Sequence, residues 1–74
     1  MDDSALRQKL GAAIRQRRQH MRVSQEAFAD SIAMHRAYYG FIERGTRNMT
    51  LVTLHRVASG LGWSLADLFK RAQL

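Results

Sequence analysis

The chain has 74 residues, a length that fits a single domain, so we expect residues 1–74 to form one folding unit. Twelve Lys and Arg residues against six Asp and Glu residues give a formal net charge of +6, which favours a polyanionic partner. Cysteine is absent, which excludes disulfides, thiolate zinc ligands and cysteine nucleophiles and is compatible with a reducing cytoplasm.

The apolar residues do not form a membrane-spanning segment. No apolar run approaches the ~18 residues that such a helix needs, and the acidic start Met1-Asp2-Asp3 is unlike a signal peptide. We therefore expect a cytoplasmic protein with no membrane partner. Ten of the twelve cationic residues are arginine. The planar guanidinium suits phosphates and guanine edges, so this bias favours nucleic acid over a merely soluble basic surface.

Apolar residues recur at helical spacing along the chain, and neither a strand pattern nor a proline interrupts them. The first predicted helix covers residues 4–20, and the next two cover 24–32 and 36–44. A fourth begins after Thr50 and runs to about Leu61, and a fifth begins after Ser64 and ends near the C-terminus. The predicted fold is an all-α, compact five-helix bundle in which residues 1–4 are flexible.

Capping residues mark the ends of several of these helices. Ser24, Thr50 and Ser64 are suitable N-caps, because a hydroxyl can accept hydrogen bonds from the free amides of a first helical turn. Asp67 follows Ser64 at the spacing of a capping box. Gly45 suits a left-handed helix stop, because glycine adopts positive φ without a steric penalty.

The two middle helices and the short turn between them predict a helix-turn-helix. Ala29 lies where the two helices would pack closest, and Met34 lies in the turn as an apolar contact. Tyr39 and Ile42 form the predicted inward face of the helix at 36–44. In this geometry the second helix can place its N-terminal side chains in a major groove of DNA.

The predicted outward face of that helix carries Arg36, Ala37, Gly40 and Phe41. Small residues at 37 and 40 would let the helix approach a base-pair surface closely. Arg36 can donate two hydrogen bonds to O6 and N7 of guanine. We therefore predict base reading in double-stranded DNA by Arg36, with Ala37 and Gly40 beside it.

Three stretches, Val23–Ala29, His35–Tyr38 and Ile42–Asn48, together resemble the lambda-repressor-like helix-turn-helix family of the Xre or Cro type. Within that family, residues 35–48 are most similar to controller proteins of restriction-modification systems. The resemblance implies a regulator of transcription, a repressor or controller protein, that binds double-stranded DNA in a sequence-specific way. It also implies a homodimer on a palindromic operator.

The resemblance assigns roles to individual residues. Gln25 matches a phosphate-binding position in the first turn of its helix, and Arg47 matches a loop residue that touches DNA. The predicted contacts to the DNA backbone or groove edge are those of Gln25, Tyr38, Phe41, Arg44 and Arg47. Arg18 and Glu43 match a pair that forms an interior salt bridge in relatives.

Several positions depart from the family pattern, Arg22, Ala33 and Tyr39 among them. Arg22 and Ala33 stand where glycine is common, so the backbone there either avoids positive φ or is strained. Tyr39 replaces a β-branched aliphatic residue, so either the core is more open at that point or the phenol reaches the surface.

The last helix supplies the predicted dimer contact. With 46% apolar residues in 74, the core is small, and dimerisation is a reasonable means of stabilising it. The candidate contacts are the exposed parts of Leu65, Leu68, Phe69 and Leu74.

No set of residues predicts catalysis or cofactor binding. A nucleophile, a base and an orienting residue cannot be assembled, and no glycine-rich phosphate loop exists. His20, His35 and His55 are interpreted as surface or capping residues rather than metal ligands. We expect no enzyme activity, metal, cofactor or small-molecule ligand.

Other interpretations of the surface residues remain open. Tyr38, Tyr39 and Phe41 could form the aromatic surface of a protein-interaction module, such as an antitoxin-like or adaptor domain. The arginines at 7, 15 and 17 are interpreted as a solvated face of the first helix.

Overall fold

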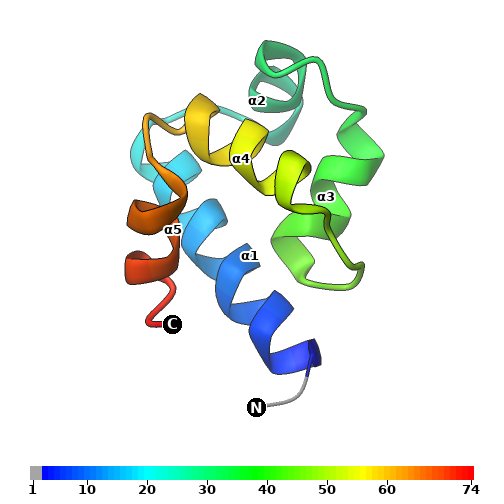
Figure 1. The fold of residues 1–74 in the computed structure, drawn as a ribbon. Helices are drawn as coiled ribbons and strands as arrows, with labels where there is room; N and C mark the ends of the chain where they lie inside the picture. The colour runs from blue at the N-terminus through cyan, green and yellow to red at the C-terminus, as the bar shows by residue number, and fades with distance from the viewer. Residues whose placement is uncertain (1–2) are drawn as a thin grey trace.

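Five helices make up most of residues 3–74, the part of the chain that the computed structural model describes. They are α1 (Asp3–His20), α2 (Gln25–Ser31), α3 (Arg36–Arg44), α4 (Leu51–Gly60) and α5 (Leu65–Arg71), shown in Figure 1. The predicted all-α, five-helix fold is confirmed. Residues 3 and 4, predicted to be flexible, form the start of α1, and residues 1 and 2 lie outside the described residues. Within residues 3–74, no helix combines the length and apolar character needed to cross a membrane.

The predicted capping residues define the helix ends. The hydroxyls of Ser24, Thr50 and Ser64 accept hydrogen bonds from backbone N–H groups at 3.0 to 3.1 Å. The Asp67 carboxylate accepts the backbone N–H of Ser64 at 2.9 Å, which completes the capping box. Gly45 ends α3 in the left-handed conformation, with φ of 69°. Each N-cap contributes about 1 kcal/mol, so local chemistry determines where the helices start.

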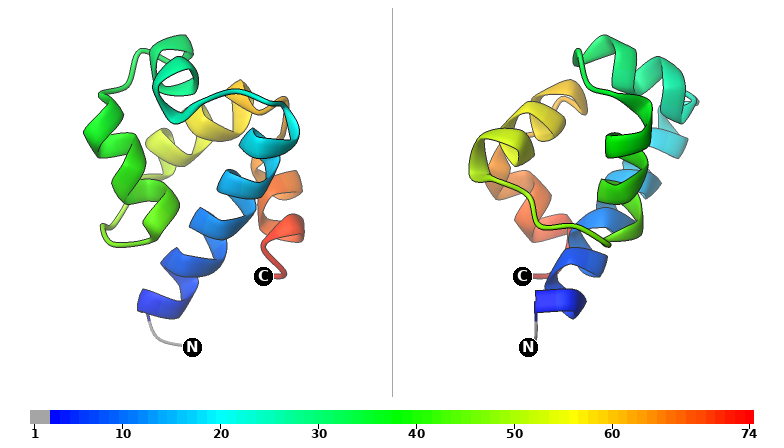
Figure 2. Two further views of the ribbon diagram at one scale, coloured as in Figure 1. Left: turned by 180° about the vertical axis from the view of Figure 1, so that it is seen from behind. Right: turned by 90° about the vertical axis from the view of Figure 1, so that its right-hand side faces the viewer.

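α1 runs through the middle of the bundle, with α3 on one side and α5 on the other (Figures 1 and 2). It packs most extensively against α3, which also packs against α2. The large side chains that are less than 2% exposed are Tyr39, Phe28, Ile14, Ile42, Leu61, Leu68 and Val57. Two helices therefore support α3 from behind.

Gly11 lets α1 approach α3 so closely that the two backbones touch. A Cβ atom at this position would lie 2.5 Å from the carbonyl oxygens of both Ile42 and Glu43. No side chain fits in that space, and helix backbone atoms in a close-packed interior cannot move aside easily. The missing side chain at residue 11 therefore determines how closely α1 and α3 approach.

The backbone is left-handed at Arg22 and Ala33, two positions that the sequence comparison with the resembled family singled out. The angle φ is 61° at Arg22 and 54° at Ala33. The sequence left open whether the backbone avoids positive φ at these positions or is strained there. The first possibility is wrong, because both residues adopt positive φ, and the backbone is strained. Left-handed geometry costs an L-residue roughly 1 to 2 kcal/mol. The tight turns before and after α2 impose this cost.

Tyr39 and Leu68 are both completely buried, which decides the roles that the sequence left open or predicted for them. Tyr39 is completely buried, so it neither opens the core nor reaches the surface. Leu68 also has no exposed surface and belongs to the core of its own chain. Its prediction as a dimer contact is therefore wrong, because it would add no area to an interface. Leu65 and Phe69 are half-buried, and Leu74 is 48% exposed.

Gly11→Ala tests the close approach of α1 and α3. Helix propensity alone predicts that alanine stabilises the protein by about 1 kcal/mol. We expect the opposite, a loss of roughly 1 to 3 kcal/mol or more, because the methyl group overlaps two carbonyl oxygens. Urea denaturation followed by circular dichroism gives the sign. The control Ala12→Gly, at an exposed position of α1, should cost at most about 1 kcal/mol. Stabilisation by Gly11→Ala would contradict the packing described.

Candidate DNA interface

A tight corner joins α2 to α3. α2 ends at Ser31, the left-handed Ala33 reverses the chain, and His35 is the N-cap of α3. The backbone N–H of Met34 donates to the carbonyl oxygen of Ala29 at 2.9 Å. The chain therefore changes direction within the four residues 32–35.

Apolar packing inside the corner holds the two helices together. Phe28 and Ala29 of α2 are buried, and the ring centroids of Phe28 and Tyr39 lie 5.1 Å apart. Met34 packs against the core from the turn, as the sequence predicted. α2 and α3 thus behave as one packed unit.

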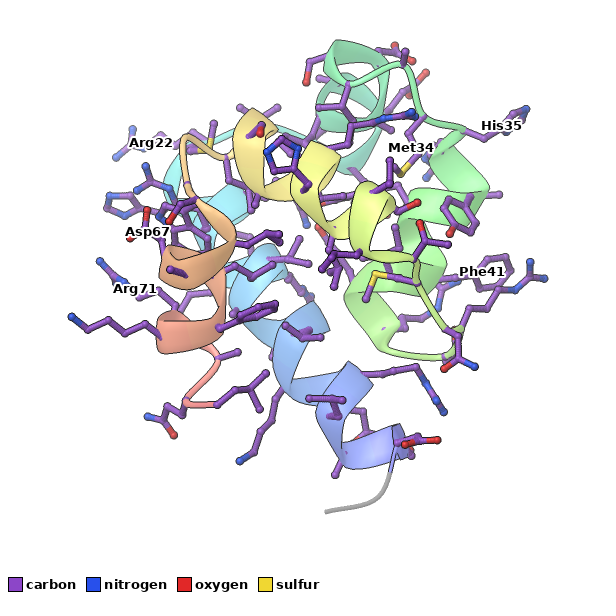
Figure 3. All side chains as sticks on the ribbon, viewed as in Figure 1. Arg22, Met34, His35, Phe41, Asp67 and Arg71 are labelled. Carbon is purple, nitrogen blue, oxygen red and sulfur yellow. The ribbon has the colours of Figure 1, made fainter. Side chains whose placement is uncertain are left out.

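The first turn of α3 faces solvent. Arg36 and Ala37 are exposed, and Tyr38 is half-buried against the core. Figure 3 shows His35 and Phe41 projecting from this side of the molecule, whereas Asp67 and Arg71 lie on the opposite side. The start of α3 is therefore accessible to a large ligand.

Gly40 is not part of the exposed face, contrary to the prediction. It is buried, and the side chain of Arg44 lies across it. A Cβ atom at residue 40 would be 3.1 Å from Nη1 of Arg44. The group that covers this point of α3 is therefore a guanidinium, and the backbone of Gly40 lies beneath it.

Phe41 contacts two guanidinium groups at the C-terminal end of α3. The Cζ atoms of Arg44 and Arg47 lie 5.1 Å and 4.1 Å from the centroid of its ring. Both distances are within the ~6 Å range of cation–π attraction. The half-buried ring is therefore covered by cations and does not form a bare apolar patch.

Gln25 is held in place from within the protein. Its side-chain amide donates to Oε1 of Glu43 at 2.9 Å. Arg15 and Arg44 line the same shallow depression as Gln25 and Glu43. Arg15 was interpreted as part of a solvated face, and spacing along the chain could not reveal that packing brings it near Gln25.

Glu43 is the centre of a buried polar network. Its carboxylate accepts hydrogen bonds from Arg18 of α1, Gln25 of α2 and Tyr39 of α3. Nε of Arg18 and Oε2 of Glu43 are 2.5 Å apart, and the Glu43 side chain is 1% exposed. This pair is the interior salt bridge that the family resemblance implied. The hydrogen bonds from Gln25 and Tyr39 were not predicted.

The network keeps Glu43 ionised. Burial opposes the charge, but hydrogen bonds from Arg18, Tyr39 and Gln25 outweigh burial and lower the pKa of Glu43. The hydrogen bond to Glu43 raises the pKa of Arg18. Burial, and then the hydrogen bond to Glu43, raise the pKa of the Tyr39 hydroxyl. At neutral pH the carboxylate is therefore charged and the phenol is protonated.

Two arginines of α1 bind loops, which corrects their interpretation as solvated residues. Arg7 donates to the carbonyl oxygen of Gly45 at 3.3 Å and to Oδ1 of Asn48 at 2.9 Å. Arg17 donates to the carbonyl oxygen of Leu61 at 3.1 Å. The contacts of Arg7 anchor the loop that carries Arg47.

The three histidines are exposed. His35 occupies the N-cap position of α3, but its side chain makes no capping hydrogen bond. Within residues 3–74, no three His, Cys, Asp or Glu side chains lie close enough together to hold a metal ion.

A packed two-helix corner that exposes an arginine at the start of its second helix, in a basic all-α domain, defines a helix-turn-helix DNA-binding protein. Residues 14–71 match the family model HTH_3, described as helix-turn-helix. The chain belongs to this family.

The chain is similar to several known regulators. It is 45% identical to the control protein C.MunI of Mycoplasma sp over 53 residues, a stretch that covers 72% of each chain. Its fold matches the restriction-modification controller protein C.AhdI from Aeromonas hydrophila with a TM-score of 0.83 and 35% identity, covering 88% of this chain and 98% of that one. The clp gene regulator ClgR from Corynebacterium glutamicum gives a TM-score of 0.88 at 30% identity, covering 97% and 77%. The predicted family is confirmed, and the chain is a DNA-binding regulator of transcription rather than an enzyme.

Glu43→Gln is expected to lower the free energy of unfolding by about 3 to 5 kcal/mol at neutral pH. The amide leaves the buried Arg18 guanidinium without a counter-charge. Urea denaturation measures the loss. The matched control is Glu26→Gln, at an exposed position of α2, which should change stability by no more than about 1 kcal/mol.

The same variant should also change the response to acid. Because the folded-state pKa of Glu43 is lowered, its contribution is fully present above the unfolded-state pKa of about 4.3. The contribution is lost as the pH falls through the folded-state value. The stability of the wild type should therefore fall more steeply between about pH 5 and pH 3 than that of Glu43→Gln. Parallel curves would mean that another group causes the acid response.

Proposed function

We propose that this regulator acts as a homodimer on a palindromic operator, with the two copies of α3 in successive major grooves about 34 Å apart. The observation that carries the proposal is the exposure of Arg36 at the start of an α3 that two helices support from behind. The net charge of +6 supplies attraction to phosphates. We assign the protein to the cytoplasm, because its target is genomic DNA.

The proposed interface contains two kinds of contact, those to base edges and those to the DNA backbone. Arg36, with Ala37 beside it, reads base edges, because its fork matches O6 and N7 of guanine. Gln25, Tyr38 and Arg47 contact phosphates or the groove edge and determine the register of α3 on the duplex. The hydrogen bond from Gln25 to Glu43 supports this role, since it orients the glutamine before DNA arrives.

The proposed dimer contact uses apolar side chains that the folded chain leaves exposed. Leu51 and Val52 at the start of α4 are 64% and 72% exposed, and Leu74 is 48% exposed. Half-buried Leu65 and Phe69 of α5 add to this set. Because α4 and α5 pack against each other, one partner subunit can cover parts of both. No small molecule is needed, and occupancy of the operator follows the concentration of dimer.

The alternative of a protein-interaction module has less support. Its proposed surface consisted of Tyr38, Tyr39 and Phe41, but Tyr39 is buried and Phe41 is covered by two guanidinium groups. The surface that remains is cationic, which suits phosphates better than an apolar partner.

Selection from a random pool of double-stranded oligonucleotides tests the proposed partner and the dimer together. We expect enrichment of a site with two-fold symmetry. On that site, log affinity should fall linearly with log salt concentration, by roughly 0.9 per neutralised phosphate. Failure to enrich any site, or an affinity that does not respond to salt, would contradict the proposal.

Arg36→Ala should weaken binding to the selected site by about 1 to 3 kcal/mol and binding to random DNA much less. Gln25→Ala and Arg47→Ala should weaken both by similar amounts, because phosphates carry no base identity. Fluorescence anisotropy at constant salt measures these affinities. Lys70→Ala, at an exposed position of α5, is the control for loss of a distant cation. Equal losses on both DNAs for Arg36→Ala would reassign Arg36 to a phosphate.

A further inference from the structure

Arg36, Gly40 and Arg44 share one stripe of α3. They are four residues apart, the spacing at which side chains lie one above another on a helix. A Cβ atom at Gly40 would lie 3.1, 3.6 and 3.7 Å from Nη1, Nη2 and Cζ of Arg44. The guanidinium of Arg44 therefore rests on the α3 backbone at the residue that lacks a side chain.

This packing brings the Arg44 guanidinium closer to the start of α3 than its place in the sequence suggests. Long side chains on a helix point toward its N-terminus and cover the preceding turn. Arg44 accordingly lines the same surface depression as Arg36, Ala37 and Phe41. Two arginine side chains thus border one surface on the outer side of α3.

The Phe41 ring and the Gly40 backbone position the Arg44 guanidinium. The ring centroid of Phe41 lies 5.1 Å from its Cζ atom. Within residues 3–74, Glu43 forms its ion pair with Arg18 and not with Arg44. The Arg44 side chain makes no hydrogen bond to these residues. Its N–H donors are therefore available to a ligand.

We propose that Arg44 is a second base-reading residue, which recognises a guanine at a position of the half-site different from the one that Arg36 reads. The planar fork of Arg44 matches O6 and N7 of guanine in the major groove. Gly40 is then a positioning residue, which makes no base contact itself and provides the surface on which Arg44 lies. This inference rests on the proposed binding to an operator and predicts guanine at two positions of each half-site.

A phosphate contact is the rival role for Arg44, because its side chain also borders the depression lined by Arg15 and Gln25. The guanidinium lies over Gly40, on the stripe that begins with Arg36, and this placement favours the base. A phosphate carries no base identity, whereas a guanine contact discriminates between bases. Removing the side chain at residue 44 therefore distinguishes the two roles.

Binding-site selection should compare the wild type with Arg44→Ala. The wild type should enrich two guanine positions in each half-site. Arg44→Ala should lose the preference at one of them, with about a tenfold or greater loss of affinity for the wild-type site and much less loss on random DNA. The matched control is Arg56→Ala, at an exposed position of α4, which should change neither. Unchanged base preferences in Arg44→Ala, with similar losses of affinity on both DNAs, would overturn the proposal and make Arg44 a phosphate ligand.

Gly40→Ala tests the positioning role. The methyl group displaces the end of a flexible side chain, so the fold should tolerate it, which thermal unfolding checks. Gly40→Ala should relax the same guanine position as Arg44→Ala, and the double variant should bind no worse than Arg44→Ala alone. Additive losses would mean that the methyl group collides with DNA directly, which contradicts a role through Arg44.

The proposal and the function on which it rests fail in different ways. If the wild type enriches no site, binding to an operator fails and this inference fails with it. If a symmetric site is enriched and Arg44→Ala keeps all of the base preferences of the wild type, only the inference about Arg44 fails.

Discussion

One buried carboxylate joins the three helices on which DNA binding depends. Glu43 lies on α3, and it accepts hydrogen bonds from Arg18 of α1, Gln25 of α2 and Tyr39 of α3. A buried charge without partners is very unfavourable, so the helices must pack in an arrangement where these donors reach it. Tyr39 fills the core with its ring and also supplies a hydrogen-bond donor to Glu43. The close approach of α1 and α3 at Gly11 is part of the same arrangement.

Side chains that DNA would not touch hold the proposed DNA-contacting residues in place at two separate points. Glu43 orients Gln25 in the first turn of α2, where the phosphate contact is proposed. Arg7 holds Gly45 and Asn48, and therefore the loop that carries Arg47. Positioning and contact are thus divided between different residues. For this reason, substitutions in the interior should affect affinity as well as stability.

On the outer side of α3, guanidinium groups lie over the Phe41 ring and the Gly40 backbone. Phe41 and Gly40 both lie against the side chain of Arg44. Packing against a ring and a bare backbone restricts a long side chain before it meets a ligand, which lowers the entropy lost on binding. The outer side of α3 therefore presents oriented guanidinium groups rather than a bare apolar surface.

The sequence by itself determined the helices, the corner between α2 and α3, and the family. Their causes are local: hydroxyl caps, apolar periodicity, the stop at Gly45, and motifs in a recognisable order; the predicted bounds 36–44 are those of α3. Only the tertiary structure decided that Gly40 lies beneath Arg44 and that Leu68 is interior. It likewise showed that Arg7 and Arg17 bind loops 38 and 44 residues away along the chain. Such contacts depend on how the helices pack, and the spacing of residues along one helix does not specify which residues of another helix or loop come near it. The class of protein could therefore be predicted, but which arginines are free to meet DNA could not.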